Sequence, residues 1–200
     1  MAVNLRAQPP ALRVVAPGDG EDEALLVAEL RRGKLDALAR CYDLLHQRVR
    51  VLARRLLWDD AAAEDVVQET FAALPAAIAR YRAEAALEAF VLAIAVKRSR
   101  HHQRAAGRRR RAVEGLGRAD GAHAGDPERD AYRRQLGERL ALALDRLPHA
   151  QRVAFVLCEV EDLTAADAAS IAEVPEATVR TRLFHARRKL RDLLAKEHDE

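Results

Sequence analysis

The stretch from Leu163 to Leu194 constrains the fold of this chain more than any other. Thr164 is followed three residues later by Asp167, a spacing that resembles a capping box and predicts the start of a short helix. This helix should end near Pro175, because proline suits the first turn of a helix and not its interior. A longer second helix follows. Its apolar residues recur at alternating steps of four and three and form one stripe: Val179, Leu183, Ala186, Leu190 and Leu193.

The opposite face of this second helix is cationic. It carries Arg180, Thr181, Phe184, Arg188 and Arg191, with His185 and Arg187 on its flanks. Two helices joined by a tight turn, the second basic on its free face, are typical of a DNA-binding helix-turn-helix. An ordinary helical hairpin with a solvated basic face is the alternative. We favour DNA binding because Phe184, a large aromatic residue among arginines, could contact thymine methyl groups in a major groove.

Composition narrows the classes of protein to which the chain can belong. Half of its residues are hydrophobic but only 4% are aromatic, so alanine and leucine dominate, as expected for helices. Cys41 and Cys158 lie far apart without metal-ligand spacing, and a reducing cytoplasm is the expected location. The sequence has no apolar signal core and no run of membrane-spanning length, so we expect no membrane insertion.

The N-terminal part of the chain predicts a tail followed by amphipathic helices. Residues 1–20 hold several prolines and glycines without periodicity, which is typical of a disordered tail. One helix is expected over about 21–32. A longer one begins at Leu35, where apolar residues recur every three or four positions as far as Leu56.

A third helix is expected to begin at Asp59 and Asp60, because acidic residues suit the N-terminal end of the helix dipole. Pro75 should kink or end it. The core face would carry Val67, Thr70 and Leu74, and the opposite face Asp65, Gln68, Glu69 and Ala72, with Phe71 at the boundary. Taken alone, the acidic residues of this segment could form no more than a solvated face.

A fourth helix, over about 85–104, is apolar on nearly every side as far as Val96, which predicts a place at the centre of a bundle. The chain then turns cationic, with Lys97, Arg98, Arg100, Arg104 and Arg108 to Arg111. A rigid helix leading into such a run is typical of phosphate binding, whereas a solvated basic tail is the alternative.

A glycine-rich stretch over 112–129 predicts a flexible linker, and it divides the chain into domains over 21–111 and 130–200. In the second domain one helix would turn Tyr132, Leu136, Leu140 and Leu144 inward, and Pro148 would open the next, which carries Val153, Val156 and Leu157. The expected fold is therefore all-α, with two small helical domains joined by a linker and the second ending in the helix-turn-helix.

The order of these pieces resembles the bacterial RNA polymerase sigma factors of the extracytoplasmic-function group, which keep only regions two and four. The segment AEDVVQETF, residues 63–71, is similar to the region-two helix that docks on the polymerase clamp helices. LPHAQRVAFVLCEVEDLT, followed by VPEATVRTRLFHARRKLR, is similar to region four. The resemblance covers residues 21–196 without the linker. It implies a factor that binds core RNA polymerase and promoter DNA, directs promoter-specific initiation, and is often held by an anti-sigma factor.

The resemblance also implies roles for particular residues. Core polymerase would be contacted by Asp65, Gln68 and Phe71. The minus-thirty-five element would be read by Arg180, Thr181, Phe184, His185 and Arg187, and the outward Arg188 and Arg191 would add contacts to DNA. Near the minus-ten element we expect Tyr81, Arg82, Lys97, Arg98, Arg100 and Arg104.

Several positions depart from the family pattern. His185 stands where arginine is typical, and Glu173 and Ala177 stand where the family turn has glycines. In region two the family commonly has a basic or aromatic loop with glycine, then Phe-Arg-x-Trp-Leu, then Ile-Ala-x-Asn and an Asp. Those places are held here by Ala83, Leu87, Glu88, Phe90, Val91, Lys97 and His101. The chain therefore offers few of the stacking and polar side chains that usually trap a flipped base.

Two other classes of function fit the sequence less well than a sigma factor. A helix-turn-helix regulator that is not a sigma subunit is the alternative, but such a protein has no need of the surface formed by Asp65, Gln68 and Phe71. An enzyme is not indicated, because the sequence has no phosphate loop, HExxH, paired cysteines or nucleophile elbow. His101 and His102 fit a basic face better than a metal site. We therefore expect no catalysis, cofactor or metal.

Overall fold

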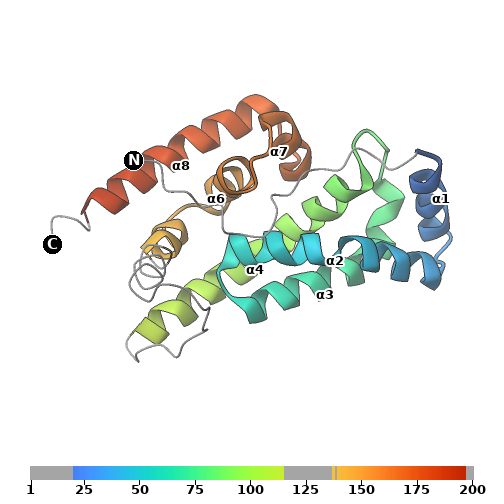
Figure 1. Cartoon of the computed structure of the whole chain (residues 1–200), viewed down its shortest axis with the longest axis horizontal. Helices are drawn as coiled ribbons and strands as arrows, with labels where there is room; N and C mark the ends of the chain where they lie inside the picture. Colours follow the sequence, from blue (N-terminus) through green and yellow to red (C-terminus); the bar gives the residue numbers. More distant parts are fainter. Residues whose placement is uncertain (1–19, 115–136, 138, 197–200) are drawn as a thin grey trace, which may run out of the picture.

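A computed structural model of the chain describes residues 20–114, 137 and 139–196. Across these residues the fold is all-α (Figure 1). The predicted tail over 1–20 and linker over 112–129 lie almost wholly outside them, as do the predicted inward positions of Tyr132 and Leu136. In the described part of the chain, no helix is long and apolar enough to cross a bilayer.

The first domain consists of four helices and a short 3-10 turn. In chain order they are α1 (Gly20–Arg31), α2 (Leu35–Leu57), α3 (Asp60–Ala77), η1 (Ile78–Arg80) and α4 (Leu87–Glu114). Asp59 caps α3 as expected, because its side chain accepts a hydrogen bond from the Ala62 N–H at 2.9 Å. Pro75 lies inside α3, which ends two residues later and tightens into η1.

The second domain is built around a long C-terminal helix. Helical residues 139–145 come first, followed by α6 (His149–Phe155), the π-helical turn η2 (Val156–Val160), α7 (Ala165–Ala172) and α8 (Glu176–Lys196). α8 packs against α6 and α7. Near the far end of α8 a small apolar cluster joins Ala186 and Leu190 to Ala143, Leu144 and Leu147.

α4 is longer than the sequence suggested, and the expected end near Arg104 is wrong. The helix continues to Glu114, through the arginine run. Arginine and alanine are good helix formers, and they carry the helix past Gly107. The basic run thus continues the same rigid helix whose earlier turns form part of the core.

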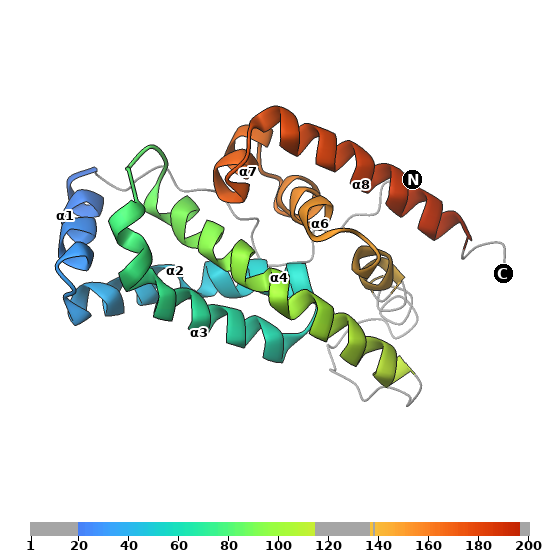
Figure 2. The same ribbon diagram turned by 180° about the vertical axis from the view of Figure 1, so that it is seen from behind.

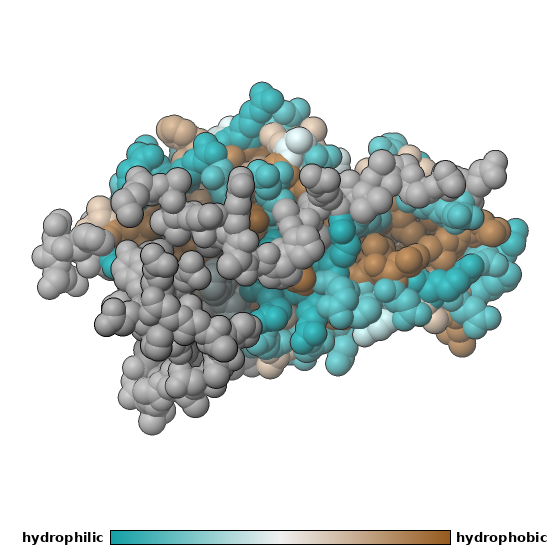
Figure 3. All heavy atoms as spheres, viewed as in Figure 1, coloured by the Kyte–Doolittle hydropathy of each residue, from teal (hydrophilic) through white to brown (hydrophobic). Residues whose placement is uncertain are grey.

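The expectation that α4 lies centrally is confirmed. It contacts α2 and α3 on one side and α7 on the other, and Figure 2 shows it running between α3 and the α6–α7 pair. Its buried residues point in every direction: Leu87, Glu88, Ala89, Val91, Leu92, Ala93, Ala95, Val96 and Ser99. The first domain also keeps apolar side chains at its surface, among them Leu25, Leu35 and Leu44, and Figure 3 shows apolar surface in the region of α1 and α2.

Candidate polymerase-docking and DNA-binding surfaces

The turn between α7 and α8 is fixed by local hydrogen bonds. Thr164 caps α7, as its spacing to Asp167 predicted: its Oγ1 accepts from the Asp167 N–H at 3.1 Å and donates to the Asp167 carboxylate at 2.7 Å. Glu173 ends α7 in the left-handed conformation, and the N–H of Val174 then donates to the Ala169 carbonyl at 3.1 Å. Pro175 follows directly before α8.

α8 has the two faces that the sequence predicted. Its inner stripe is buried at Val179, Ala186 and Leu190 and half-buried at Leu183 and Leu193. All of the predicted minus-thirty-five residues are exposed: Arg180, Thr181, Phe184, His185, Arg187, Arg188 and Arg191. The Phe184 side chain is 62% exposed, which is unusual for a ring of its size.

Some residues of this basic face already have partners in the free protein. Arg180 pairs with Glu176 one turn earlier on α8, and Arg187 pairs with Glu159 of η2. Thr181 donates its hydroxyl hydrogen to the Ala177 carbonyl at 2.9 Å. Any contact from Arg180 to a base must therefore displace Glu176, which is exposed enough to move.

The predicted docking residues on α3 divide into two groups. Asp65 and Gln68 lie on the exposed face, whereas Phe71 is only 6% exposed and packs edge-on against Tyr42 of α2, with ring centroids 4.9 Å apart. The structure therefore brings Asp65 and Gln68 to the surface together and places the Phe71 ring beneath them. The sequence could not indicate that His102 of α4 would contact Glu69 on the same surface, at 2.9 Å.

The residues predicted to lie near the minus-ten element include both exposed and buried side chains. Lys97, Arg98 and Arg100 are exposed on α4 and Arg82 is exposed in the loop before it, while the side chain of Arg104 lies outside the described part. Tyr81 is buried: its hydroxyl lies 2.7 Å from both the Glu23 carboxylate and the Ala85 carbonyl. Desolvation is the main cause that raises the Tyr81 pKa, with the Glu23 contact second. In this conformation the Tyr81 ring supports the domain and is not available to stack on a base.

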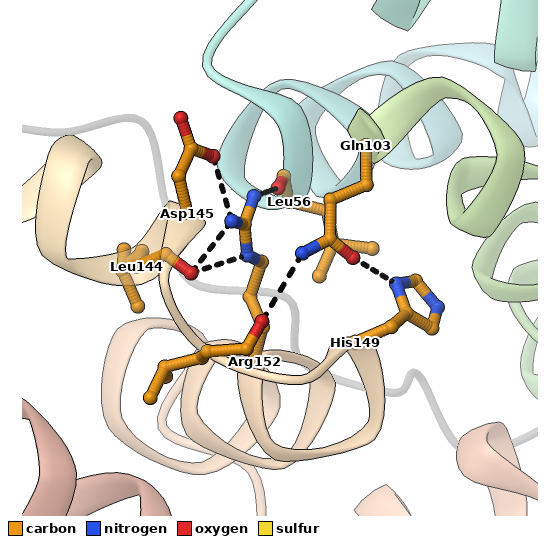
Figure 4. A network of polar contacts seen from close by, with 7 residues as sticks. Leu56, Gln103, Leu144, Asp145, His149 and Arg152 are labelled. Atoms are coloured by element: carbon orange, nitrogen blue, oxygen red, sulfur yellow. Dashed lines mark hydrogen bonds and ion pairs between the residues drawn. The ribbon is translucent and has the colours of Figure 1, made fainter. Parts of the chain in front are cut away.

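A buried arginine, which the sequence did not single out, joins the two domains. Arg152 of α6 donates to the Leu144 carbonyl through Nε at 2.9 Å and Nη2 at 2.6 Å, and to Asp145 at 2.6 Å (Figure 4). Its Nη1 donates to the Leu56 carbonyl of α2 at 2.8 Å. The carbonyl oxygens in the last turn of a helix have no partner within it, so this guanidinium completes the ends of two helices.

His149 of α6 makes a second contact between the domains. Its Nε2 lies 3.1 Å from the Val96 carbonyl and its Nδ1 lies 2.8 Å from the Gln103 amide, both on α4. Desolvation lowers the pKa of His149 to about 4, so the ring is neutral and its one proton is on Nε2, facing the carbonyl. Nδ1 must then accept, so we assign the Gln103 amide with its NH₂ toward Nδ1 and its oxygen toward Arg152, the reverse of the orientation drawn in Figure 4.

Two family models match the chain, one in each domain. Residues 41–109 match the family model of Sigma-70 region 2, and residues 137–190 match that of Sigma-70, region 4. The chain is 30% identical over 179 residues to the RNA polymerase sigma-H factor of Pseudomonas aeruginosa, covering 84% of this chain and 91% of that protein. It is also 30% identical over 189 residues to the ECF RNA polymerase sigma factor SigK of Mycobacterium ulcerans, covering 89% of this chain and 96% of that protein.

Two solved structures share the fold. CnrH, solved in complex with the cytosolic domain of CnrY, has a TM-score of 0.57 and 22% identity, over 87% of this chain and 97% of that one. The sigma factor RpoE, solved with the anti-sigma factor NepR from Bartonella quintana, has a TM-score of 0.51 and 24% identity. The match covers 78% of this chain and 96% of that one. With both sigma regions present in order and relatives that extend over nearly the whole chain, the protein belongs to the RNA polymerase sigma factors of the extracytoplasmic-function group.

Proposed function

We propose that this sigma factor docks on core RNA polymerase through the exposed face of α3 and reads promoter DNA with α8 and the basic end of α4. Sigma factors bind core polymerase and promoter DNA and direct initiation. The observation that carries the assignment of surfaces is α8, which buries one stripe and leaves every predicted reading residue exposed. A helix-turn-helix regulator outside the sigma family is set aside, because the first domain matches sigma region 2 as well.

For polymerase docking, we infer that some residues of α3 contact the polymerase and that others hold the contacting face in place. Asp65 and Gln68 are exposed and can contact the polymerase directly, whereas Phe71 holds this face in place by packing on Tyr42. Arginine and lysine side chains of the polymerase are the expected partners of a face that carries Asp65 and Glu69. His102, which contacts both carboxylates, would then lie at the edge of the docked surface.

For promoter recognition, the residues of α8 differ in what they can contact. Arg180, Thr181 and Phe184 lie near the N-terminal end, which enters the major groove in this motif and reads base edges. Arg188 and Arg191 lie further along, where phosphates are the expected partners. On α4, Lys97, Arg98 and Arg100 would neutralise phosphates near the minus-ten element. The boundaries 21–111 and 130–200 remain our proposal for the two domains.

Further partners follow from the same function. One of the two solved structures compared above is a complex with an anti-sigma factor, and we propose that such a factor regulates this protein as well. A protein that supplies contacts to polymerase and promoter needs no catalytic residues of its own, and we propose that it works beside the chromosome in the cytoplasm without a cofactor.

The docking surface is tested by pull-down of purified core polymerase with the full-length protein. Asp65→Ala/Gln68→Ala should weaken binding by an order of magnitude or more, because charged hydrogen bonds at an interface are worth roughly 1.5–3 kcal/mol each. The matched control is Asp36→Ala/Gln47→Ala, which removes the same two residue types from exposed positions on α2. If both double variants bind core polymerase as tightly as the wild type, the docking surface lies elsewhere.

A further inference from the structure

The chain between η1 and α4, residues 82–86, forms a loop whose ends are held by α1. Tyr81 lies directly before the loop, and its hydroxyl proton is shared between the Glu23 carboxylate and the Ala85 carbonyl, each 2.7 Å away. The backbone carbonyl of Tyr81 accepts a hydrogen bond from Arg31 at 2.5 Å. Glu23 lies in the first turn of α1 and Arg31 is its last residue, and Figures 1 and 2 both show α1 beside this loop. α1 therefore binds Tyr81 through both its side chain and its backbone.

Glu23 also caps α4. The N–H of Leu87, the first residue of α4, donates at 3.1 Å to the same carboxylate oxygen that faces Tyr81. The first N–H groups of a helix have no partner within it, and a negative charge is favourable at that end of the helix dipole. Leu87 is buried, so water is a poor substitute for this carboxylate. One oxygen of Glu23 thus holds both the residue before the loop and the residue after it.

The side chains of the loop give it little support of their own. Three of its residues, Ala83, Ala85 and Ala86, have no polar side-chain atom with which to brace a turn. Ala83 has a φ of 57°, in the left-handed region that favours glycine and costs other residues conformational energy. The loop is fixed at its two ends, through Tyr81 and Leu87, and Glu23 takes part in both contacts.

The loop carries one of the residues expected near the minus-ten element. Arg82 directly follows Tyr81, and its side chain is exposed. An arginine side chain is long and flexible, so the backbone beneath it must be held in place before it can favour one base over another. α1 lies outside residues 41–109, which match sigma region 2. The position of Arg82 therefore depends on a helix that the region-2 match does not include.

We propose that α1 sets the shape of this loop and thereby sharpens the choice of minus-ten sequence, with Glu23 and Arg31 as positioning residues. The inference rests on the proposed function, because it assumes that Arg82 lies at the minus-ten element. Neither positioning residue contacts DNA itself. Glu23 carries a charge of the same sign as phosphate, so the loss of a direct contact with DNA cannot explain a weaker preference in its variants.

Holoenzyme formed from core polymerase and the full-length protein tests the proposal on duplex promoters with a fixed minus-thirty-five element. Its affinity is measured for a minus-ten element that the wild type selects from a library and for a changed one, and the ratio of the two affinities is compared among variants. Glu23→Ala should lower this ratio several-fold, because residues that act through others commonly change coupling by a factor of about 2–30. Glu23→Gln should keep it, because an amide oxygen still accepts from both partners. The matched control Asp22→Ala removes an exposed acid from the same turn of α1 and should also keep it.

Further substitutions separate positioning from direct contact. Tyr81→Phe keeps the ring and removes the hydroxyl, so it should lower the ratio, whereas a ring that stacked on a base would keep its effect. Adding Glu23→Ala to Tyr81→Phe should lower the ratio less than Glu23→Ala does alone, because the contact with the hydroxyl is already lost. Arg31→Met should lower the ratio as well, whereas Arg32→Met, which removes the next exposed arginine, should not.

A merely structural role of Glu23 predicts a different pattern. Glu23→Ala would then lower the melting temperature and weaken binding to core polymerase and to all promoters about equally, with the ratio unchanged, and this outcome overturns the proposal. If Glu23→Ala does not fold, Tyr81→Phe decides, because it loses only one hydroxyl, and a ratio equal to that of the wild type overturns the proposal as well. A wild-type holoenzyme without any preference at the minus-ten element would instead contradict the proposed function on which the inference rests.

Discussion

The guanidinium of Arg152 in α6 donates a hydrogen bond to the carbonyl oxygen of Leu56 in α2 at 2.8 Å, although the two residues are 96 positions apart. Leu56 lies in the last turn of α2, where carbonyl oxygens lack a partner within the helix. Arg152 also bonds the Leu144 carbonyl and Asp145 in its own domain. One buried cation therefore links the last turn of α2, in the first domain, to the second domain.

Replacing Arg152 should destabilise the protein more than replacing any exposed arginine. Arg152→Met leaves two buried carbonyl oxygens and Asp145 without this donor, and losing one partner of a buried network costs roughly 3–5 kcal/mol. Urea unfolding of the full-length protein measures the change. The control Arg80→Met removes an exposed arginine and should cost less than about 0.5 kcal/mol. Equal losses for both variants would show that the Arg152 network contributes nothing specific.

Acid should weaken the fold through His149. Its pKa is lowered from 6.5 to about 4 in the folded protein by desolvation, with Arg152 and Arg100 adding smaller repulsion. The unfolded chain therefore takes up the proton first as the pH falls. The contribution of His149 to the free energy of unfolding is fully present above pH 6.5 and is lost progressively down to about pH 4. The loss from this group is at most about 3 kcal/mol.

The check is urea unfolding across this pH range for the wild type and His149→Gln. The free energy of unfolding should fall less for the variant than for the wild type between pH 6.5 and 4, even if the variant is less stable at pH 6.5. His101→Gln, which changes an exposed histidine on α4, serves as the control and should keep the wild-type slope. A His149→Gln variant with the same slope as the wild type would contradict the role assigned to this ring.

The sequence predicted most of the helices, but it did not predict which residues at the edge of a helix face are buried by neighbouring helices. The stripe of α8 and the cap at Thr164 follow from spacing within a few residues, and both are confirmed. Phe71 and Tyr81 are buried by α2 and α1, helices that periodicity within one segment cannot place. From the sequence, Arg152 looks like an ordinary polar residue on a short helix. Its burial cannot be predicted locally, because its partner Leu56 is remote in sequence. Such contacts between domains need tertiary structure.

Two arginines of α8 should respond differently to substitution in the polymerase-bound protein. Arg180→Ala removes the contact to a base edge that we propose, and it should cost on the order of 1–3 kcal/mol on the cognate minus-thirty-five element only. Arg191→Ala removes the phosphate contact that we propose, so it should weaken binding to all DNA about equally and reduce the salt slope by about one unit. Binding to cognate and scrambled duplexes across a salt series measures both. Equal losses on the two duplexes for Arg180→Ala would remove that residue as a base reader.

Initiation by the reconstituted enzyme tests the central claim most directly. Purified core polymerase is combined with the full-length protein on a library of promoter sequences, and the start sites of the transcripts are counted. We predict transcripts from a subset of promoters that share a minus-thirty-five element, with Asp65→Ala/Gln68→Ala lowering their yield and Arg180→Ala relaxing the preference. Transcription no greater and no more selective than that of core polymerase alone would contradict the assignment of this protein as a working sigma factor.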